Sequence, residues 1–497
     1  MRLKTSLILC LALLLVVAAS INRTAADSPK KPVANGNGAS EWTLYGRDLN
    51  GSHYNPLEKA LTPATASRLK VKWIFETEGD VSSQPIVVNG VVYFGSWDGK
   101  EYAVDAQTGK KIWEFEDNPS NSSRSGAAYA DGVLYYGDLS GRLYALDAKT
   151  GALKWKTRLD DHKETVATSS PIYYNGVLYI GVSSLEEGAV LKSRNYECCT
   201  FRGGVLAVNA KTGDKVWRWY TIPEEPKVIG KDKRNINIKG PAGGAVWSTI
   251  SINPKDNRLY VSTGNQYTGP ASPYPNAIIA LDLKTGKMVW HNQTTPKDIW
   301  TFNCRNDPDC SDLDVDFGTI PMMFKGAGGK MLVGAGQKSG YFWALDPKDG
   351  KTVWNTKVGE GGKLGGIEFG AATDGERVYA AISNAANRNR QGSVSALDGA
   401  TGKILWQTLS PDKGSHFGPI SVTGTGANRL VYAGSSNGHM YVYDAKDGKI
   451  LWEHDTGGAV GGGPTIVDGV LYVGSGYQFL RVGKGNNKLF AFSIDGK

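Results

Sequence analysis

The chain of 497 residues is poor in the residues that several functions require. It has only five cysteines and six histidines and contains no CxxCH motif, so we expect no covalently attached c-type haem. Acidic and basic residues are interspersed, without the long basic run that is typical of nucleic-acid-binding proteins, so we expect no nucleic-acid partner. The apolar run at residues 7–19 is shorter than the ~20 residues of a membrane-spanning helix.

The N-terminus has the pattern of a signal peptide. A basic start at residues 2–4 precedes the apolar run 7–19, and small residues follow at 25–26. We therefore predict that residues 1–26 are cleaved, that 27–40 form a flexible segment, and that the mature protein is secreted or periplasmic. A retained membrane anchor is the alternative.

Four cysteines remain after this predicted cleavage, and they occur as two close pairs. An even number in an exported protein favours disulfides. Three pairings are possible, and proximity in the sequence favours Cys198–Cys199 and Cys304–Cys310.

Glycine and tryptophan, by contrast, are abundant, with 63 and 14 residues. One pattern recurs seven times: a strand-like run reaches Asp or Asn, Gly follows four residues later, and Trp four residues after that. The Asp side chain can bond the following backbone, Gly supplies a positive φ in the turn, and the Trp ring can tie one unit to the next. The copies end at Trp113, Trp155, Trp217, Trp290, Trp354, Trp406 and Trp452.

Most copies follow another pair of strand-like runs, which gives four strands per unit. We therefore predict an all-β, eight-bladed β-propeller over residues 41–497. The eighth unit is split: residues 469–496 lack a closing Trp, and a strand around Trp73 would complete the blade and close the ring. Seven blades and a separate hairpin are the alternative. The middle copies carry insertions at roughly 185–201, 222–242, 266–276 and 294–315.

The candidate functional residues lie in these insertions or close to them in the sequence. Glu186 and Glu187 follow a strand, Trp247 lies outside the repeat position, and Asn265 ends a strand. Carboxylate and amide oxygens suit a hard cation, and an indole can support a planar ligand. Each residue also has an ordinary interpretation as a solvated loop acid, a core Trp or a turn Asn.

Taken together, the segments EWTLYGRDLNGSHYNPL, SSLEE, CCTFRGG, GGAVW, STGN and DVDFG resemble the quinoprotein alcohol dehydrogenases, in particular the polyvinyl-alcohol-dehydrogenase-like branch. The resemblance covers roughly residues 41–496. It implies an eight-bladed propeller that binds pyrroloquinoline quinone and Ca²⁺ and oxidises an alcohol.

The resemblance also implies roles for individual residues. Glu186, Asn265 and Asp314 match the calcium ligands, and Asp314 also matches the catalytic base. The remaining matches concern the cofactor: Trp247 lies against the quinone ring, Arg124 contacts its carboxylates, Lys338 lies beside its oxygens, and Cys198, Cys199 and Arg202 lie near its channel. Asp316 is the alternative base.

The implied reaction transfers a hydride from the alcohol to the quinone, while the base takes the hydroxyl proton. Electrons then leave to an external acceptor, a cytochrome or a quinone. The alternatives are a secreted, non-catalytic propeller that binds a protein or polymer, and a cofactor-binding sensor without turnover.

Overall fold

The structure, a computed structural model, describes residues 41–118, 121–385 and 391–497. They belong to one compact unit, residues 35–497. The predicted signal peptide 1–26 and the segment 27–40 lie outside the described residues.

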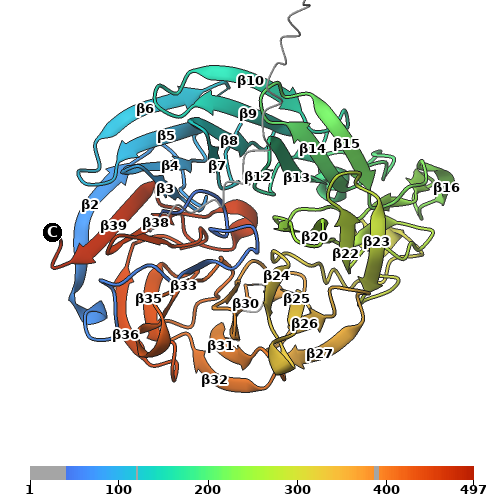
Figure 1. Cartoon of the computed structure of the whole chain (residues 1–497). Helices are drawn as coiled ribbons and strands as arrows, with labels where there is room; N and C mark the ends of the chain where they lie inside the picture. Colours follow the sequence, from blue (N-terminus) through green and yellow to red (C-terminus); the bar gives the residue numbers. More distant parts are fainter. Residues whose placement is uncertain (1–40, 119–120, 386–390) are drawn as a thin grey trace, which may run out of the picture. The chain divides into compact units, whose positions relative to one another are not determined.

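Eight sheets follow one another along the chain and surround a common centre (Figure 1); their strands pair antiparallel, except that β1 pairs parallel with β33. The first four blades are β3 (Ile86–Val88), β4 (Val91–Gly95), β5 (Lys100–Asp105) and β6 (Lys111–Glu116); β7 (Ala128–Ala130), β8 (Val133–Gly137), β9 (Arg142–Asp147) and β10 (Leu153–Arg158); β11 (Thr165–Val166), β12 (Ile172–Tyr174), β13 (Val177–Ser184), β14 (Gly204–Asn209) and β15 (Lys215–Tyr220); and β19 (Ser251–Asn253), β20 (Arg258–Ser262), β22 (Ala277–Asp282) and β23 (Met288–Gln293).

The second half continues the same order. Its blades are β24 (Met322–Lys325), β25 (Met331–Gly336), β26 (Tyr341–Leu345) and β27 (Thr352–Lys357); β28 (Gly365–Gly366), β29 (Ala371–Thr373), β30 (Arg377–Asn384), β31 (Ser393–Asp398) and β32 (Ile404–Leu409); β1 (Tyr54–Asn55), β33 (Ser421–Thr423), β34 (Leu430–Gly434), β35 (His439–Asp444) and β36 (Ile450–Asp455); and β2 (Leu69–Glu76), β37 (Thr465–Val467), β38 (Val470–Ser475) and β39 (Lys488–Ile494). The prediction of an eight-bladed propeller is confirmed.

Residues of the repeat form the contact between successive blades. In the turn of the second blade, Asp147 accepts a hydrogen bond from Thr150 N at 3.1 Å, and Gly151 has a φ of 74°. The ring of Trp113, from the first blade, lies against this turn: a Cβ on Gly151 would lie 2.9 Å from it. The indole N–H donates to Ala148 O at 2.9 Å. The same Trp-on-Gly contact joins Trp73 to Gly109, Trp155 to Gly213, Trp217 to Gly286, Trp290 to Gly350, Trp354 to Gly402, and Trp406 to Gly448.

The two ends of the described chain close the ring in one blade. Strand β2 pairs antiparallel with β39, which places Trp73 opposite Ala491. Trp452 of the seventh blade donates its indole N–H to Leu69 O in β2 at 2.9 Å. The predicted split blade is thereby confirmed, and the alternative of seven blades with a separate hairpin is wrong.

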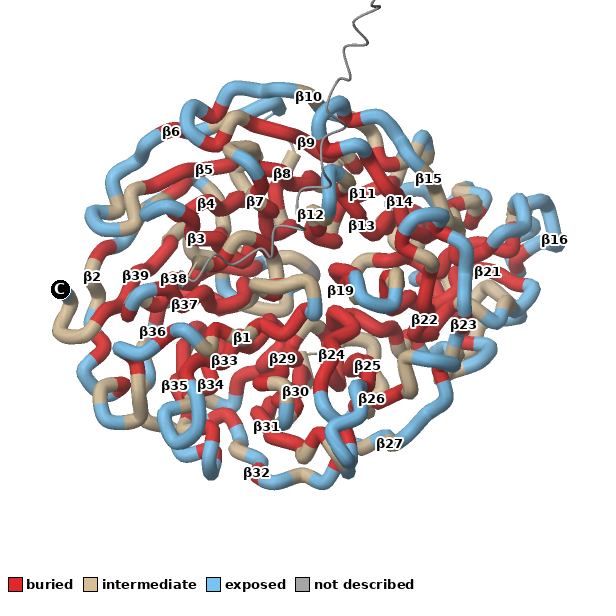
Figure 2. The backbone as a smooth tube through the Cα atoms, viewed as in Figure 1, coloured by how far each residue is buried: buried red, intermediate tan, exposed pale blue. Residues whose placement is uncertain are grey.

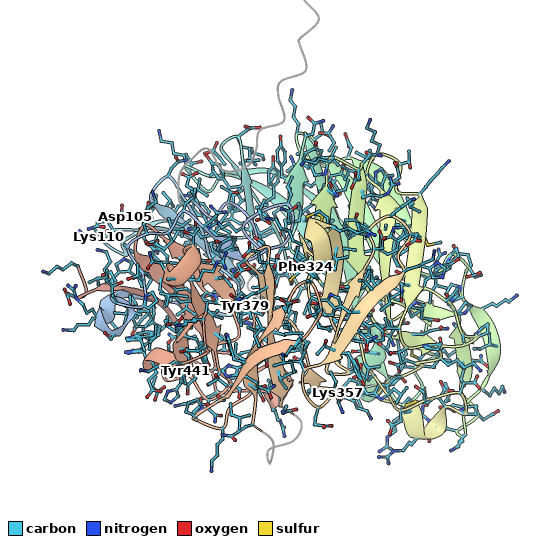
Figure 3. The ribbon with its side chains drawn as sticks, turned by 60° about the horizontal axis from the view of Figure 1, so that its bottom comes forward. Asp105, Lys110, Phe324, Lys357, Tyr379 and Tyr441 are labelled. Carbon is cyan, nitrogen blue, oxygen red and sulfur yellow. A yellow bond between two sulfur atoms is a disulfide. The ribbon has the colours of Figure 1, made fainter. Side chains whose placement is uncertain are left out.

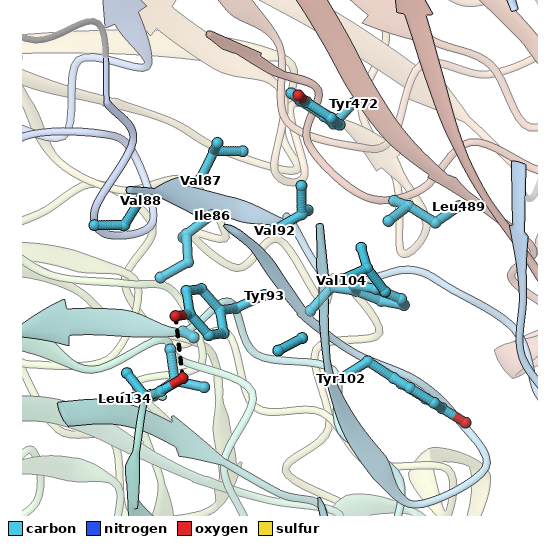
Figure 4. Close-up of a cluster of buried hydrophobic side chains, with 14 of the residues drawn as sticks. Ile86, Val87, Val88, Val92, Tyr93, Tyr102, Val104, Leu134, Tyr472 and Leu489 are labelled. Carbon is cyan, nitrogen blue, oxygen red and sulfur yellow. Dashed lines mark hydrogen bonds between the residues drawn. The ribbon is translucent and has the colours of Figure 1, made fainter. Parts of the chain in front are cut away.

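Burial falls from the centre of the ring to its rim (Figure 2). The inner strands β3, β33 and β37 are wholly buried, whereas β6 on the rim exposes four of its six residues. Apolar side chains of neighbouring blades pack together between the sheets, as Ile86, Val92, Leu134 and Tyr472 do in Figure 4. In Figure 3, the turn residues Asp105 and Lys110 lie at the edge, whereas Phe324 and Tyr379 lie inside.

The insertions add structure outside the repeat. They contain the helix α1 (Glu186–Lys192), the hairpin of β16 (Lys227–Lys231) and β17 (Asn237–Gly240), which projects beyond the ring in Figure 1, and a small sheet of β18 (Ala242–Gly243) and β21 (Gln266–Thr268). Short 3-10 turns occur at Ala66–Arg68, Cys304–Asn306, Ala327–Gly329, Gly426–Asn428 and Phe479–Arg481. Among the described residues, no helix combines the length and apolar character that a membrane crossing needs.

Both predicted disulfide pairings, Cys198–Cys199 and Cys304–Cys310, are present. Each lies in an insertion rather than in the repeated blades. The vicinal pair is buried in a hydrophobic cluster, whereas the second pair closes a loop of the 294–315 insertion.

Candidate functional site

A cavity that opens to solvent, with about 750 Å³ of free space including its mouth, is lined by residues of six blades. Its lining combines apolar and polar side chains, as is usual for small-molecule sites. Four of the predicted site residues line it: Arg124, Trp247, Asn265 and Lys338. The lining also includes Glu187, Asp316, Glu368, Phe369 and Tyr477.

Two aspartates and a lysine form an ionic cluster at this cavity. Lys338 Nζ lies 3.1 Å from Asp314 Oδ1 and 3.3 Å from Asp316 Oδ2. Asp316 also accepts hydrogen bonds from Asn265 N at 2.5 Å and from the indole N–H of Trp247 at 3.0 Å. Both carboxylate oxygens of Asp316 therefore accept hydrogen bonds, and the residue lines the cavity. Asp314, the predicted base and metal ligand, contacts Lys338 but is not part of the cavity lining.

A third aspartate fixes the conformation of Asp314. The buried Asp298 accepts hydrogen bonds from Asp314 N at 3.0 Å, from Val315 N at 2.8 Å and from Asn276 Nδ2 at 2.7 Å. These bonds hold Asp314 at a φ of 55°, in the left-handed region. Burial raises the pKa of Asp314 to about 7, against the opposing effect of Lys338.

The two adjacent glutamates have different environments. Glu186 is fully buried, and its carboxylate accepts hydrogen bonds from Phe201 N at 2.7 Å, Thr200 N at 2.9 Å and Tyr196 OH at 2.9 Å. It does not line the cavity. Although burial opposes it, bonds from His162 and these backbone N–H groups lower the pKa of Glu186.

Glu187, one residue further, lines the cavity. Burial, with the charges of Asp314 and Asp316, raises the pKa of Glu187 well above its usual value. The structure thus brings Glu187, rather than the predicted Glu186, to the cavity. The reason is local: the helix that begins at Glu186 turns successive side chains about 100° apart, so neighbours face different surroundings.

Asn265 presents its amide oxygen to a ligand. Its Nδ2 donates to Gln266 O at 3.0 Å and to Trp300 O at 2.9 Å, so both of its hydrogens are used. The carbonyl oxygen Oδ1 remains available at the cavity, where Asp316 and Glu187 also lie. No three His, Cys, Asp or Glu side chains of the described part form a ready metal site. A cation here would therefore draw on the Asn265 amide oxygen as well as on carboxylates.

Trp247 forms a wall of the cavity. Its ring packs edge-on against Phe369, with 5.1 Å between centroids, and Lys338 Nζ lies 5.5 Å from the ring centroid. Gly318 makes room for the indole, because a Cβ there would lie 2.0 Å from it. A planar ligand can stack on such a ring.

Arg124 is held among aromatic rings at the cavity wall. It donates to Tyr477 OH at 2.7 Å, and its guanidinium carbon lies 4.9 Å from the ring centroid of Phe479 and 5.6 Å from that of Trp97. These contacts leave a fixed positive charge beside the cavity, which suits a ligand that carries carboxylates.

The other residues predicted near the cofactor do not line the cavity. Cys198 and Cys199 are buried, and their backbone pairs with Lys239 (Cys199 N to Lys239 O, 2.9 Å). Arg202 donates to Pro223 O at 2.9 Å, pairs with Glu225 and lies over the ring of Tyr220. The vicinal pair packs in the hydrophobic cluster that includes Tyr267, so its relation to the cavity is indirect.

Glu368 is a cavity residue that the sequence analysis missed. It is 6% exposed, and its Oε1 has no hydrogen-bond partner among the described residues. Burial raises the pKa of Glu368 to about 7. The segment GGIEFG has no spacing that marks a site, so no sequence signal pointed to it.

The protein is an eight-bladed propeller whose cavity gathers carboxylates, an amide, two cations and a half-buried indole, a lining that suits a planar, anionic ligand. The comparisons with known proteins specify the class. The family model described as "Glucose/ethanol/alcohol dehydrogenase, beta-propeller domain" matches residues 42–354, and that of the outer membrane protein assembly factor BamB matches residues 390–496.

Two relatives are each named polyvinylalcohol dehydrogenase. The chain is 34% identical to that of a Pseudomonas species, covering 92% of this chain and 77% of the relative. It is 33% identical to that of Sphingopyxis sp. strain 113P3, covering 96% and 81%. The solved quinohemoprotein alcohol dehydrogenase ADHIIG of Pseudomonas putida HK5 has the same fold, with a TM-score of 0.73 at 21% identity over 92% of this chain and 81% of that one. The chain belongs to the family of quinoprotein, pyrroloquinoline-quinone-dependent alcohol dehydrogenases.

This membership excludes the non-catalytic scaffold as the main interpretation. Some relatives, such as that of Comamonas testosteroni, are named quinohemoproteins. The expected absence of a covalent haem therefore stays a prediction.

Proposed function

We propose that this protein oxidises hydroxyl groups of a polymeric or secondary alcohol, with pyrroloquinoline quinone and Ca²⁺, outside the cytoplasm. The observation that carries this proposal is the convergence of Glu187, Asn265, Asp316, Lys338 and the Trp247 ring on one cavity. The names of the two relatives that are about one-third identical support a polymeric alcohol. Electrons leave to an external acceptor, a cytochrome or a quinone.

The cavity residues fit the two groups that the family implies. The Trp247 face suits a flat ring system, and Arg124 and Lys338 suit its carboxylates and carbonyl oxygens. Glu187, Asp316 and the Asn265 amide supply oxygen ligands of the kind that Ca²⁺ prefers. A divalent cation would also favour the ionised form of Glu187, whose pKa is kept high by burial and by the charges of Asp314 and Asp316.

Bound here, the quinone would supply a hydride acceptor and the cation a Lewis acid. The residues of this chain orient the groups and move the proton. Asp314 is the proposed base, because burial brings its pKa to about 7, near the working range of a proton acceptor. Lys338 bonds both aspartates and so stabilises the ionised form of the base. Asp298 fixes the backbone of Asp314.

Asp316 is the competing base because it lines the cavity directly. The experiment compares Asp314→Asn with Asp316→Asn in protein reconstituted with pyrroloquinoline quinone and Ca²⁺. For Asp314→Asn we expect kcat to fall by at least about 100-fold with cofactor binding retained, since general-base catalysis contributes ~10²–10⁴-fold. For Asp316→Asn we expect weaker Ca²⁺ binding.

Three outcomes would change this proposal. Full activity of Asp314→Asn, with loss of kcat but not of Ca²⁺ binding in Asp316→Asn, would assign the base to Asp316. Absence of both quinone absorbance and dye reduction by any alcohol in the reconstituted protein would reject the enzyme. Retention of the unprocessed N-terminus in the exported protein would favour the membrane anchor.

A further inference from the structure

A groove lies beside the cavity and is built by the 294–315 insertion and residue 363. It is open to solvent, and its free space of about 910 Å³ includes part of that solvent. The Cys304–Cys310 disulfide closes the loop that forms part of its wall. Its other lining residues are Trp300, Thr301, Phe302, Arg305, Asp312 and Lys363.

The lining of the groove adjoins that of the cavity, although no residue belongs to both. Lys363 lines the groove and the next residue, Leu364, lines the cavity, so one Cα–Cα step of ~3.8 Å separates the two linings. On another side, Phe302 N donates to the carbonyl of Glu187 at 3.3 Å. The groove therefore lies next to the cavity.

A second contact makes the same link through the proposed metal site. The side chain of Asn265 donates to Trp300 O at 2.9 Å, so one residue at the cavity anchors the backbone of the groove. The shape of the groove is thus tied to the geometry of the site where oxidation takes place.

The loop of the groove is held from outside by the projecting hairpin. Lys233 donates from its backbone N to Asn306 O at 3.1 Å and from Nζ to Arg305 O at 2.9 Å. Asn303 Nδ2 donates to Asp232 Oδ2 at 3.3 Å. Two insertions that are about 70 residues apart in the sequence therefore support one preformed surface, which lowers the entropic cost of binding.

The chemistry of the groove is amphipathic. Phe302 is 43% exposed although it is apolar, and its ring packs edge-on against Trp300, with 4.8 Å between centroids. Lys363 Nζ lies 5.4 Å from the centroid of the Trp300 ring and pairs with Asp312. Aromatic surface next to hydroxyl, guanidinium, ammonium and carboxylate groups suits a carbon chain that carries a hydroxyl group at regular intervals.

We propose that this groove binds the chain of a polymeric alcohol next to the unit that is oxidised in the cavity. The apolar carbons of the polymer lie on Phe302 and Trp300, and its hydroxyl groups bond Thr301, Asp312 and Lys363. This inference rests on the proposed function and adds to it a second, non-catalytic binding site. Two observations favour this occupant over a protein electron acceptor: the groove lies next to the cavity, and two relatives about one-third identical are named polyvinylalcohol dehydrogenase.

The experiment compares kcat/KM for polyvinyl alcohol with kcat/KM for the short diol pentane-2,4-diol. In Phe302→Ala we expect the polymer-to-diol ratio to fall about fivefold, as expected from ~40 Å² of lost apolar contact. Phe302→Tyr keeps the ring and should keep the ratio. The matched control is Leu405→Ala in β32, because Leu405 is 44% exposed and lies in another blade. We expect no change in the ratio for this control.

A binding measurement separates this inference from the proposed function. Isothermal titration calorimetry of polyvinyl alcohol against the cofactor-free protein needs no turnover, and Phe302→Ala should weaken binding by the same factor. If the reconstituted enzyme oxidises neither alcohol, the proposed function fails, whereas the calorimetry still tests the groove.

Equal loss of kcat/KM for polymer and diol would overturn the polymer site, as would unchanged polymer affinity in Phe302→Ala. A change confined to the KM of a protein electron acceptor would also overturn it and assign the groove to that partner. Far-UV circular dichroism and a thermal unfolding curve establish that each variant is folded.

Discussion

The adjacent glutamates provide a sharp test, because the same substitution should have opposite consequences one residue apart. Glu186→Gln places an amide donor against the N–H groups of Thr200 and Phe201, which now donate to a carboxylate. Glu187→Gln removes a carboxyl group whose pKa is raised by burial and by the charges of Asp314 and Asp316. We therefore expect the first variant to lose stability and the second to lose affinity for the metal.

The magnitudes follow from the contacts. A hydrogen bond to a charged group contributes ~1.5–3 kcal/mol, and Gln cannot accept from all the donors that face Glu186, so we expect a loss of about 3 kcal/mol. For a chain of this size that loss lowers Tm by about 3 °C. In Glu187→Gln the free energy of unfolding of the metal-free protein should stay equal or rise by about 1 kcal/mol, since a neutral amide avoids the cost of burying an ionisable group beside Asp314 and Asp316.

Three assays check these values. Differential scanning calorimetry without metal and cofactor gives Tm, titration with Ca²⁺ in the presence of pyrroloquinoline quinone gives the metal affinity, and dye reduction gives turnover. We expect Glu187→Gln to weaken Ca²⁺ binding at least tenfold and Glu186→Gln to retain it. The reverse pattern would refute the reasoning: Glu186→Gln would be stable but would no longer bind Ca²⁺, and Glu187→Gln would be unaffected. That result would assign the calcium ligand to Glu186, as the family resemblance implied.

Two further predictions concern stability. Burial raises the pKa of Glu101 to about 8, so the folded state holds a proton that the unfolded state releases near pH 4.5, and stability falls as pH rises from about 4.5 to 8. Glu101→Gln should remove this loss of unfolding free energy, which is on the order of 3 kcal/mol. Urea unfolding of both proteins at pH 5 and pH 9 measures it, and parallel pH profiles for the two proteins would contradict the prediction. Gly350→Ala should cost about 3 kcal/mol, because Gly350 has a φ of 73° and a Cβ would lie 2.5 Å from Trp290. Gly375→Ala, with a φ of 88° and nothing within 4 Å, should cost only about 1 kcal/mol, and equal thermal shifts would show that the Trp contact is unimportant.

The repeat was sufficient to predict the propeller because each copy carries its own physical cause. The Asp–turn–Gly–Trp spacing specifies a local turn, and the ring of one copy needs the glycine of the next. The closing strand around Trp73 followed from the missing Trp of residues 469–496, since a ring has to pair its last edge.

The site was only partly predictable. Trp247 stood out because it breaks the repeat, and Asn265, Arg124 and Lys338 were found through the family motifs; all four line the cavity. Glu368 had no motif and came to the cavity through the fold alone.

The sequence by itself determined the number of blades, the disulfide partners and the family, since these depend on local spacing and on order along the chain. Only the tertiary structure decided which of two adjacent glutamates faces the cavity, and it placed Cys198, Cys199 and Arg202 outside the lining. A side chain's direction depends on the helix that carries it and on the donors that surround it, and those donors come from segments far apart in the sequence.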